Sequence, residues 1–301
     1  MQQTGTECEF SNSDSWVILS PIEQSIKRKI ESVGTPLKDW DINIYRGVLT
    51  GYNEAFIIST EKRDEILANC QSDDERKRTE ELIRPILRGR DIKRYGYNWA
   101  GQWLIATFPS RHYDIEKYPA VKNYLLSFGI ERLEQTGKEH NVNGEKIKAR
   151  KKTNNKWFET QDSISYWEDF SKPKVMWKII GCNINFSFDD TNKICNNAVD
   201  IMTGKRSQLL QFVGLMNSKL FDWYLKLTTE AEVQGGGIQL YVTTLEKTLL
   251  KLDFPEELND VIEQRLMSKV SDEDVDKTIY RLYNLTNDEI VFIHSCKQVN
   301  R

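Results

Sequence analysis

The sequence contains little proline and glycine, with 7 and 16 such residues among 301. Disordered chains are usually rich in these residues, so we expect a folded protein without long linkers. The five cysteines are scattered and odd in number, which favours free thiols over a disulfide framework. The first ten residues lack the basic and apolar regions of a signal peptide. The sequence therefore predicts a cytoplasmic globular protein.

Long hydrophobic runs are also missing. The most apolar stretch, Leu209–Leu227, is interrupted by polar side chains such as Asn217 and Asp222, so it does not fit a membrane span. Its apolar residues recur at helical spacing, which is typical of a helix packed in a core. We expect one helix from Ser207 to Leu227 and no contact with a membrane.

Motifs that hold cofactors or metal ions are absent from the sequence. The glycines at 235–237 follow a predicted helix, whereas a phosphate-binding loop follows a strand. The three histidines lie far from one another and from paired cysteines, which excludes a zinc motif. No two prolines are adjacent, so the Asn/Asp-Pro-Pro-aromatic motif of DNA methyltransferases is missing. We expect no catalytic residue, metal or cofactor in this chain.

One short pattern is similar to the metal-binding acids of nucleases. Asp91-Ile92-Lys93 follows Asp73 and Asp74, but such nucleases need their acids on adjacent strands that converge on Mg²⁺. Here the two upstream acids begin a predicted helix. A small metal-dependent nuclease is therefore an alternative that we do not favour.

Hydrophobic periodicity predicts an α+β fold, with a mixed or antiparallel curved sheet, packed helices and a helical C-terminal appendix. The segments with strand-like composition are 41–50, 55–59, 102–108 and a hairpin over 175–188 that turns near Gly181. Capping boxes at Ser20 and Ser72 predict two helix starts. We expect an N-terminal tail over 1–19, a main domain over 20–252 and the appendix over 253–301.

The net charge of −3 hides an uneven distribution. Six bases and no acid lie between Lys146 and Lys156, and five bases and one acid lie between Arg84 and Arg94. Eleven acids and four bases lie between Asp253 and Glu289. Local clusters rather than the whole-chain charge produce an electrostatic footprint, so both basic segments are candidate contacts of a polyanion.

The first basic segment is followed by Trp157-Phe158 inside a polar stretch, 131–160, that we expect to be a long surface loop. Closely spaced cations neutralise phosphates, and a flanking aromatic side chain can stack or wedge. The candidate DNA contacts are Lys148, Arg150, Lys151, Lys152 and Trp157. A solvated basic loop without a ligand is the alternative.

The second basic segment is Arg84–Tyr95, in which Pro85 and Gly89 predict a shaped loop. Arginine can bind guanine O6 and N7, or phosphate, with two hydrogen bonds. The candidate DNA contacts are Arg88, Arg90, Lys93 and Arg94. The alternative is a network of ion pairs with the preceding acidic helix.

A third candidate contact is the end of the predicted strand over 41–50. A turn at Gly51 is expected to expose Thr50, Tyr52 and Asn53 at a tip, with Arg46 close by. Asparagine can pair with adenine, threonine can contact the thymine methyl group, and arginine can bind guanine. The structural alternative makes Arg46 a buried ion-pair partner and Asn53 a left-handed turn residue.

Several ordered motifs resemble one known family. They are Pro36–Trp40, Tyr45–Phe56, Ile83–Ile92, Trp157–Glu159, Lys172–Val175, Leu215–Leu220, Gly235–Gly237 with Tyr241, and Ile279–Ile290. From about Ser20 onward the chain resembles the TaqI-like C-terminal specificity domain, which follows the methyltransferase domain in type IIG restriction enzymes and related N6-adenine DNA methyltransferases.

The resemblance implies sequence-specific recognition of double-stranded DNA by a target recognition domain over 20–252, and it adds Lys174 to the candidate contacts. It also implies a methyltransferase or nuclease partner, in cis or as a separate subunit. We expect those domains to be missing here and to use S-adenosylmethionine and Mg²⁺, so this chain is non-catalytic in isolation. A protein-interaction or assembly module of the same system, docking through Leu209–Leu227 and the acidic helices, is the other alternative.

Overall fold

The computed structural model describes residues 19–181, 184–228, 232–233, 237–251 and 254–296. Of the predicted tail over 1–19, all but Leu19 lies outside these residues. The helices are α1 (Pro21–Glu31), α2 (Asn53–Phe56), α3 (Thr60–Ala68), α4 (Asp73–Leu82), α5 (Pro119–Leu126), α6 (Ile130–Leu133), α7 (Arg206–Asn217), α8 (Lys219–Thr228), α9 (Val242–Leu245), α10 (Glu256–Leu266), α11 (Asp272–Leu282) and α12 (Asn287–Ser295).

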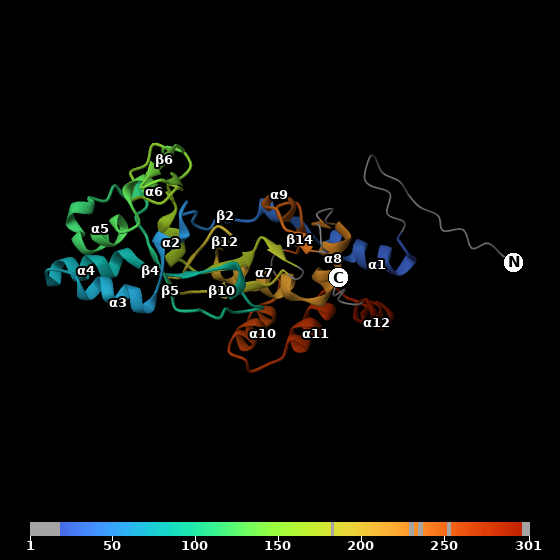
Figure 1. The fold of residues 1–301 in the computed structure, drawn as a ribbon. Helices are drawn as coiled ribbons and strands as arrows, with labels where there is room; N and C mark the ends of the chain where they lie inside the picture. Colours follow the sequence, from blue (N-terminus) through green and yellow to red (C-terminus); the bar gives the residue numbers. More distant parts are fainter. Residues whose placement is uncertain (1–18, 182–183, 229–231, 234–236, 252–253, 297–301) are drawn as a thin grey trace.

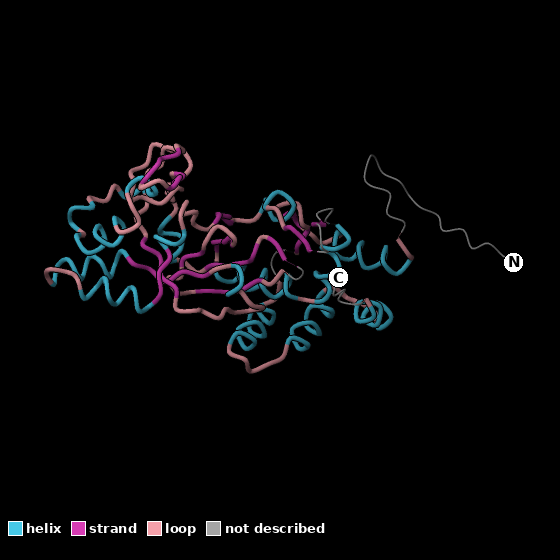
Figure 2. The backbone as a smooth tube through the Cα atoms, viewed as in Figure 1, coloured by secondary structure: helices cyan, strands magenta, loops and turns pink. Residues whose placement is uncertain are grey.

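The strands are short, and most of them pair antiparallel. They are β1 (Thr35–Pro36), β2 (Ile42–Arg46), β3 (Ile57–Ser59), β4 (Ile83–Leu87), β5 (Gln102–Ile105), β6 (Glu139–Val142), β7 (Glu145–Lys148), β8 (Lys174–Lys178), β9 (Ile180–Gly181), β10 (Phe186–Asp189), β11 (Ile194–Cys195), β12 (Val199–Gly204), β13 (Glu232–Val233), β14 (Gly237–Gln239) and β15 (Leu249–Leu250). The predicted α+β class is confirmed, with strands crossing the middle of the molecule between groups of helices (Figures 1 and 2).

The central sheet has the strand order β10-β8-β12-β2, and all its pairs are antiparallel. Side chains alternate between its two faces. Val175 and Trp177 enter a core shared with α7, α8 and the C-terminal helices, whereas Met176 and Ile201 enter a second core shared with β3–β5 and α5. The strand pairing predicted over 175–188 is confirmed, since β8 pairs with β10. Gly181, expected near the turn, belongs to β9, which pairs with β14.

A second sheet has the order β11-β4-β5-β3, in which β11 runs parallel to β4. The expectation of a loop from Arg84 onward is wrong for residues 84–87, because they belong to β4 and Pro85 lies opposite Trp103. Proline lacks an N–H donor, but β11 pairs with β4 only at Ile86 and Leu87, after the proline. The strand expected over 55–59 is also shortened, because α2 occupies Asn53–Phe56.

The single helix predicted from Ser207 to Leu227 is two helices. Helix α7 begins at Arg206, and the extended backbone of Ser218 (φ −74°, ψ 154°) separates it from α8. The Ser218 hydroxyl donates to the carbonyl of Leu215 and accepts from the amide of Phe221, so its side chain stabilises the break. Nearly all apolar side chains of both helices are buried, and Leu227 is partly buried.

The acidic segment after residue 253 forms the helices α10, α11 and α12, as predicted. Ile262, Val275 and Ile279 are fully buried in the same core as α7 and α8. The domain boundary expected between residues 252 and 253 stays a prediction. Among the helices described, none combines the length and apolar character needed to cross a bilayer.

Candidate nucleic-acid interface

A cleft of about 1160 Å³ collects segments that are far apart in the sequence. Its lining residues come from β2, the turn after β4, the end of β8 with β9, the residue before β10, the turn between β11 and β12 with the start of β12, and the segment from β14 into α9. They are Ile44, Tyr45, Arg46, Arg88, Gly89, Arg90, Ile92, Lys93, Lys178, Ile179, Ile180, Asn185, Asn196, Asn197, Ala198, Asp200, Gln239, Leu240, Tyr241, Val242 and Thr243. Five of these side chains are basic, one is acidic, and four carry amides.

Backbone hydrogen bonds hold the turn between β11 and β12 at the cleft wall. The amide of Asn196 donates to the carbonyl of Leu87 at 2.9 Å, and that of Asn197 donates to the carbonyl of Val48 at 2.9 Å. A Cβ atom at Gly47 would lie 2.1 Å from the carbonyl oxygen of Asn196. Only glycine allows this close approach, so Gly47 brings the ends of β2 and β4 together with the asparagine pair.

Arg46 is exposed at the end of β2, opposite Asp200 of β12 in the antiparallel register. Asp200 is only 4% exposed, and burial raises its pKa to about 6 although Arg46 opposes the shift. The backbone of Arg46 is held by Tyr166, whose hydroxyl donates to the Arg46 carbonyl at 2.7 Å while its ring stacks on Tyr45. The alternative of a buried ion pair is wrong in its geometry, because Arg46 forms no ion pair within 4 Å among the described residues.

The basic side chains in the turn after β4 differ in their surroundings. Arg88 donates two hydrogen bonds to the Asp91 carboxylate, from Nε at 3.0 Å and from Nη2 at 3.1 Å, so part of its guanidinium group is already bound within the protein. Arg90 and Lys93 are exposed at the cleft. Arg94 points away from the cleft, pairing with Asp272 of α11 at 3.3 Å and donating to the carbonyl of Asn217. The structure therefore gives Arg94 a role in packing rather than a place in the cleft.

The expected exposed tip is only partly exposed. Thr50 is fully buried, and its hydroxyl donates to the side chain of Asn53 at 2.7 Å. Tyr52 is half-buried against Phe128, with the Arg132 guanidinium over its ring. Asn53 is exposed and begins α2, so it is not the left-handed residue of the turn; Gly51 is, with φ 79°. The buried Thr50 hydroxyl also accepts a hydrogen bond from the amide of Tyr52, so Thr50 stabilises the turn and is not available as a DNA contact.

The polar stretch over 131–160 is not a plain loop. It contains α6 and the β6–β7 hairpin, and Phe158, Glu159 and Thr160 are buried. Lys148, Lys151 and Lys152 are exposed on and after this hairpin, which we call the basic hairpin segment (residues 139–152). It rises on the same side of the molecule as α9, with β2 between them (Figure 1).

Arg150 differs from the lysines around it. It is 5% exposed, and its guanidinium donates to the carbonyls of Leu133, Thr50, Glu159 and Trp157 at 2.6–2.9 Å. Burial lowers its pKa to about 10, against the effect of Glu159. Because carbonyls occupy its donors, Arg150 is a structural residue and we leave it out of the interface. Trp157 is half-buried and packs edge-on against Phe158.

Lys174 is also buried rather than available to DNA. Its side chain is fully buried, and its ammonium group pairs with Asp189 at 2.5 Å and donates to the carbonyls of Phe170 and Thr191. Burial opposes ionisation of Asp189, but Lys174 and Thr191 together hold the pKa of this carboxyl below its usual value. The pair fastens β8 to β10 and leaves Lys174 outside the cleft.

Sequence reasoning missed several residues of the cleft. Lys178, Asn196, Asn197, Gln239 and Tyr241 all line it. Tyr241 is 49% exposed, so its ring and hydroxyl are accessible from the cleft. The asparagine pair carried a weak signal, because adjacent amides between two strands can read bases as well as form turns.

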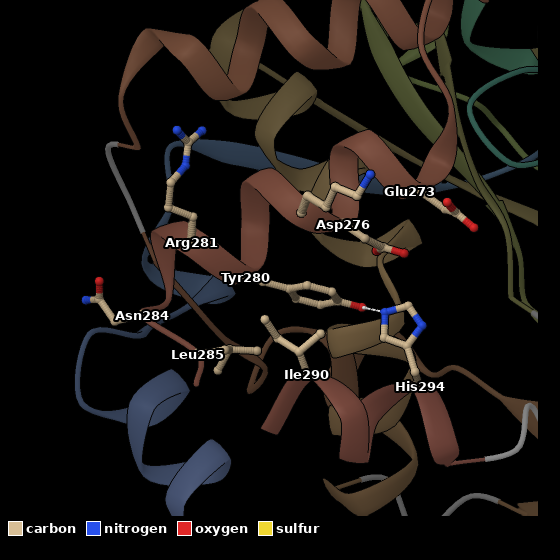
Figure 3. Close-up of a pocket in the computed structure, with 9 residues that line it drawn as sticks. Glu273, Asp276, Tyr280, Arg281, Asn284, Leu285, Ile290 and His294 are labelled. Atoms are coloured by element: carbon tan, nitrogen blue, oxygen red, sulfur yellow. Dashed lines mark hydrogen bonds between the residues drawn. The ribbon is translucent and has the colours of Figure 1, made fainter. Parts of the chain in front are cut away.

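A second hollow, of about 510 Å³, lies between α11 and α12 in the C-terminal appendix. Figure 3 shows Tyr280 and His294 pointing toward one another there, with hydroxyl and ring nitrogen 3.4 Å apart. Glu273 and Asp276 balance Lys277 and Arg281 around it, so no charge of one sign dominates. This hollow contains none of the candidate DNA contacts.

The acids of the nuclease-like pattern lie in different elements and are not grouped as metal ligands. Asp73 and Asp74 begin α4, whereas the carboxylate of Asp91 accepts hydrogen bonds from the side chain and the backbone amide of Arg88. Within the described residues, no three His, Cys, Asp or Glu side chains are grouped as metal ligands would be.

Comparison with known proteins agrees with this picture. The sequence profile described as the TaqI-like C-terminal specificity domain matches residues 84–248, more than half of the chain. No protein among curated sequences matches. The type IIG restriction endonuclease BpuSI shares the fold with a TM-score of 0.57 and 11% identity, over 90% of this chain and 31% of BpuSI.

The type IIL restriction-modification enzyme MmeI, solved in complex with DNA, is similar with a TM-score of 0.53 and 12% identity. The match covers 86% of this chain and 35% of MmeI. At these identities the likeness concerns the fold alone. The chain spans about a third of the length of either enzyme.

Proposed function

The chain belongs to the family of TaqI-like C-terminal specificity domains, and we propose its function from this membership. The proposed function is recognition of a specific double-stranded DNA sequence for a restriction–modification system. One observation carries it. Arg46, Arg88, Arg90 and Lys93, each proposed from the sequence as a DNA contact, line one cleft together with Lys178 and three asparagines.

The chemistry of this cleft suits base edges as well as phosphates. Arginine donors match guanine O6 and N7, and amides match adenine N6 and N7. The basic hairpin segment adds exposed lysines, which suit phosphates because they are point charges on flexible stems. In this proposal the cleft reads the sequence, while Lys148, Lys151, Lys152 and Asn53 hold or flank the duplex.

Catalysis is assigned to other domains in this proposal. A methyltransferase that uses S-adenosylmethionine to modify adenine, with or without a Mg²⁺-dependent nuclease, would act in cis or as a partner subunit in the cytoplasm. The support is the resemblance together with the lack of cofactor motifs in the 301 residues. A protein-docking function would use the appendix instead, where the acidic helices lie.

Selection from a library of randomised duplexes tests the proposal. The 301-residue chain is expected to enrich one consensus sequence, with affinity that falls steeply as salt rises. Arg90→Ala is expected to weaken the enrichment and relax the consensus at one base pair, whereas Arg206→Ala, which removes an exposed arginine outside the cleft, is the matched control and should select the wild-type consensus. Wild-type protein that binds no duplex, or binds all duplexes equally, would contradict the proposal.

A further inference from the structure

We propose that Arg46 and Asp200 together read one G·C base pair, with Arg46 binding the guanine and Asp200 accepting a hydrogen bond from the cytosine amino group. This inference rests on the proposed function and names a pair of specificity-determining residues within it. Asp200 carried no signal in the sequence. It is identified by its position in the cleft.

The strand register places the two side chains as a pair. Arg46 and Asp200 are direct partners in the antiparallel pairing of β2 with β12. Side chains that lie directly opposite project from the same face of a sheet, with Cβ atoms about 4.5–5.5 Å apart. Both residues line the cleft. A donor group and an acceptor group are therefore presented next to each other to whatever enters.

This order of groups complements one base pair. In the major groove a G·C pair presents two acceptors, guanine N7 and O6, followed by one donor, the cytosine N4 amino group. The guanidinium of Arg46 supplies two donors, and the carboxylate of Asp200 supplies the acceptor. A·T and T·A pairs present an adenine donor between acceptors, which this arrangement matches less well.

The charges in the cleft and the burial of Asp200 favour a base over a phosphate as the group that Asp200 contacts. Among the described residues that line the cleft, Asp200 is the only acid beside five bases. A phosphate at this position would meet a like charge, which costs free energy. The described part of the chain contains no side chain that donates a hydrogen bond to Asp200 or pairs with it within 4 Å. Asp200 lines the cleft, where an amino group of a ligand could donate to its carboxylate, and a partly buried carboxylate gains from such a donor.

The titratable groups that interact electrostatically with the pair include Asp162, Tyr166 and Cys195. Asp162 is half-buried, and burial raises its pKa while Arg46 and Lys151 oppose the shift. The raised pKa of about 6 for Asp200 still leaves its carboxylate mostly ionised at a mildly alkaline pH, the form that accepts hydrogen bonds. The competing role for Asp200 is that of a positioning residue, which would orient Arg46 without contacting DNA.

Base analogues separate the two roles. The consensus duplex from the selection is remade with pyrimidin-2-one, which lacks the amino group, at each cytosine in turn, and with 7-deazaguanine at each guanine. At one cytosine the analogue is expected to weaken wild-type binding by about 5- to 100-fold. Asp200→Ala should bind more weakly at the start and show no further loss with that analogue. Arg46→Ala should be insensitive to 7-deazaguanine in the same base pair.

Asp190→Asn is the matched control, because Asp190 is an exposed acid outside the cleft. Asp200→Val, which has no acceptor on its side chain and suits a strand, provides a second variant if alanine impairs folding. If Asp200→Ala keeps the wild-type response to pyrimidin-2-one and loses the response to 7-deazaguanine, Asp200 positions Arg46 and the inference is overturned. If a consensus is selected but no cytosine in it shows the loss of binding with pyrimidin-2-one, the inference about Arg46 and Asp200 is overturned while the proposed function stands. It falls together with the proposed function when no consensus is selected.

Discussion

The two basic segments of the chain look alike in sequence and differ in structure. Residues 146–156 carry six bases without an acid, and residues 84–94 carry five bases with one. In the first segment the lysines remain exposed, while Arg150 is buried among carbonyls. In the second, Arg90 and Lys93 reach the cleft, while Arg88 and Arg94 bind acids of the protein itself.

A run of positive charge therefore does not identify the cations that are available to DNA. An arginine whose donors are occupied by carbonyls or carboxylates stabilises the fold. A cation without such partners keeps its hydrogen-bonding capacity for a ligand. Substitutions that contrast a residue of one kind with a residue of the other test this division.

The largest effect is expected for Arg150→Ala. Four backbone carbonyls would lose their donor, so the free energy of unfolding should fall by about 3–4 kcal/mol, measured by urea denaturation. Lys151→Ala, next to it and exposed, should change this free energy by less than about 0.5 kcal/mol. Equal and small effects of the two substitutions would show that Arg150 is not a structural residue.

Asp200→Asn should stabilise the protein in a pH-dependent way. The folded protein holds the Asp200 proton more tightly than the unfolded chain, with a pKa of about 6 against 3.8. Ionisation between these values therefore costs folding free energy as pH rises. Wild type is expected to lose up to about 3 kcal/mol between about pH 4 and about pH 8 through this group, and Asp200→Asn to avoid that loss.

Thermal unfolding of both proteins across this pH range measures the difference. The gain from Asp200→Asn should be largest above about pH 7 and shrink as the pH falls through the folded-state pKa of about 6. A gain in stability with a loss of sequence preference would mark a residue retained for function. A variant that is destabilised at every pH would contradict this account of Asp200.

Arg90→Ala and Arg88→Ala compare a free and an engaged arginine of one turn. Arg90→Ala should cost about 1–3 kcal/mol of binding on the preferred duplex and relax the preference at a single base pair. Arg88→Ala should lower stability as well, because Asp91 loses its partner. The measurement is the affinity of each protein for the preferred duplex and a panel of its single-base variants. If Arg90→Ala loses affinity evenly across the panel, Arg90 contacts a phosphate rather than a base.

The smallest effect per residue is expected in the basic hairpin segment. Replacing Lys148, Lys151 and Lys152 with alanine should weaken binding to all duplexes about equally. The slope of log affinity against log salt should flatten by up to about 2.7, or roughly 0.9 for each phosphate that the variant no longer neutralises. An unchanged slope would remove this segment from the interface.

Local signals in the sequence determined much of the secondary structure. The capping box at Ser20, the strand pairing over 175–188 and the helices after residue 253 form as predicted. Capping depends on neighbours within a few residues, such as Ser20 with Glu23, and such interactions can be recognised from spacing. The errors arose at Ser218 and Pro85, where tertiary contacts decided between a helix and a break, and between a loop and a strand.

The sequence by itself also determined that the chain is an α+β protein with two basic segments and resembles the TaqI-like specificity domains. Only the tertiary structure decided which cations are free. Thr50, Arg150 and Lys174 look polar and available in sequence, yet all three are buried. Arg150 donates to the carbonyl of Thr50, 100 residues away, and Lys174 pairs with Asp189, 15 residues away. Asp200 meets Arg46 across a strand pair that no local pattern encodes. Burial and pairing are properties of the packed chain, and they decide what a charged side chain can bind.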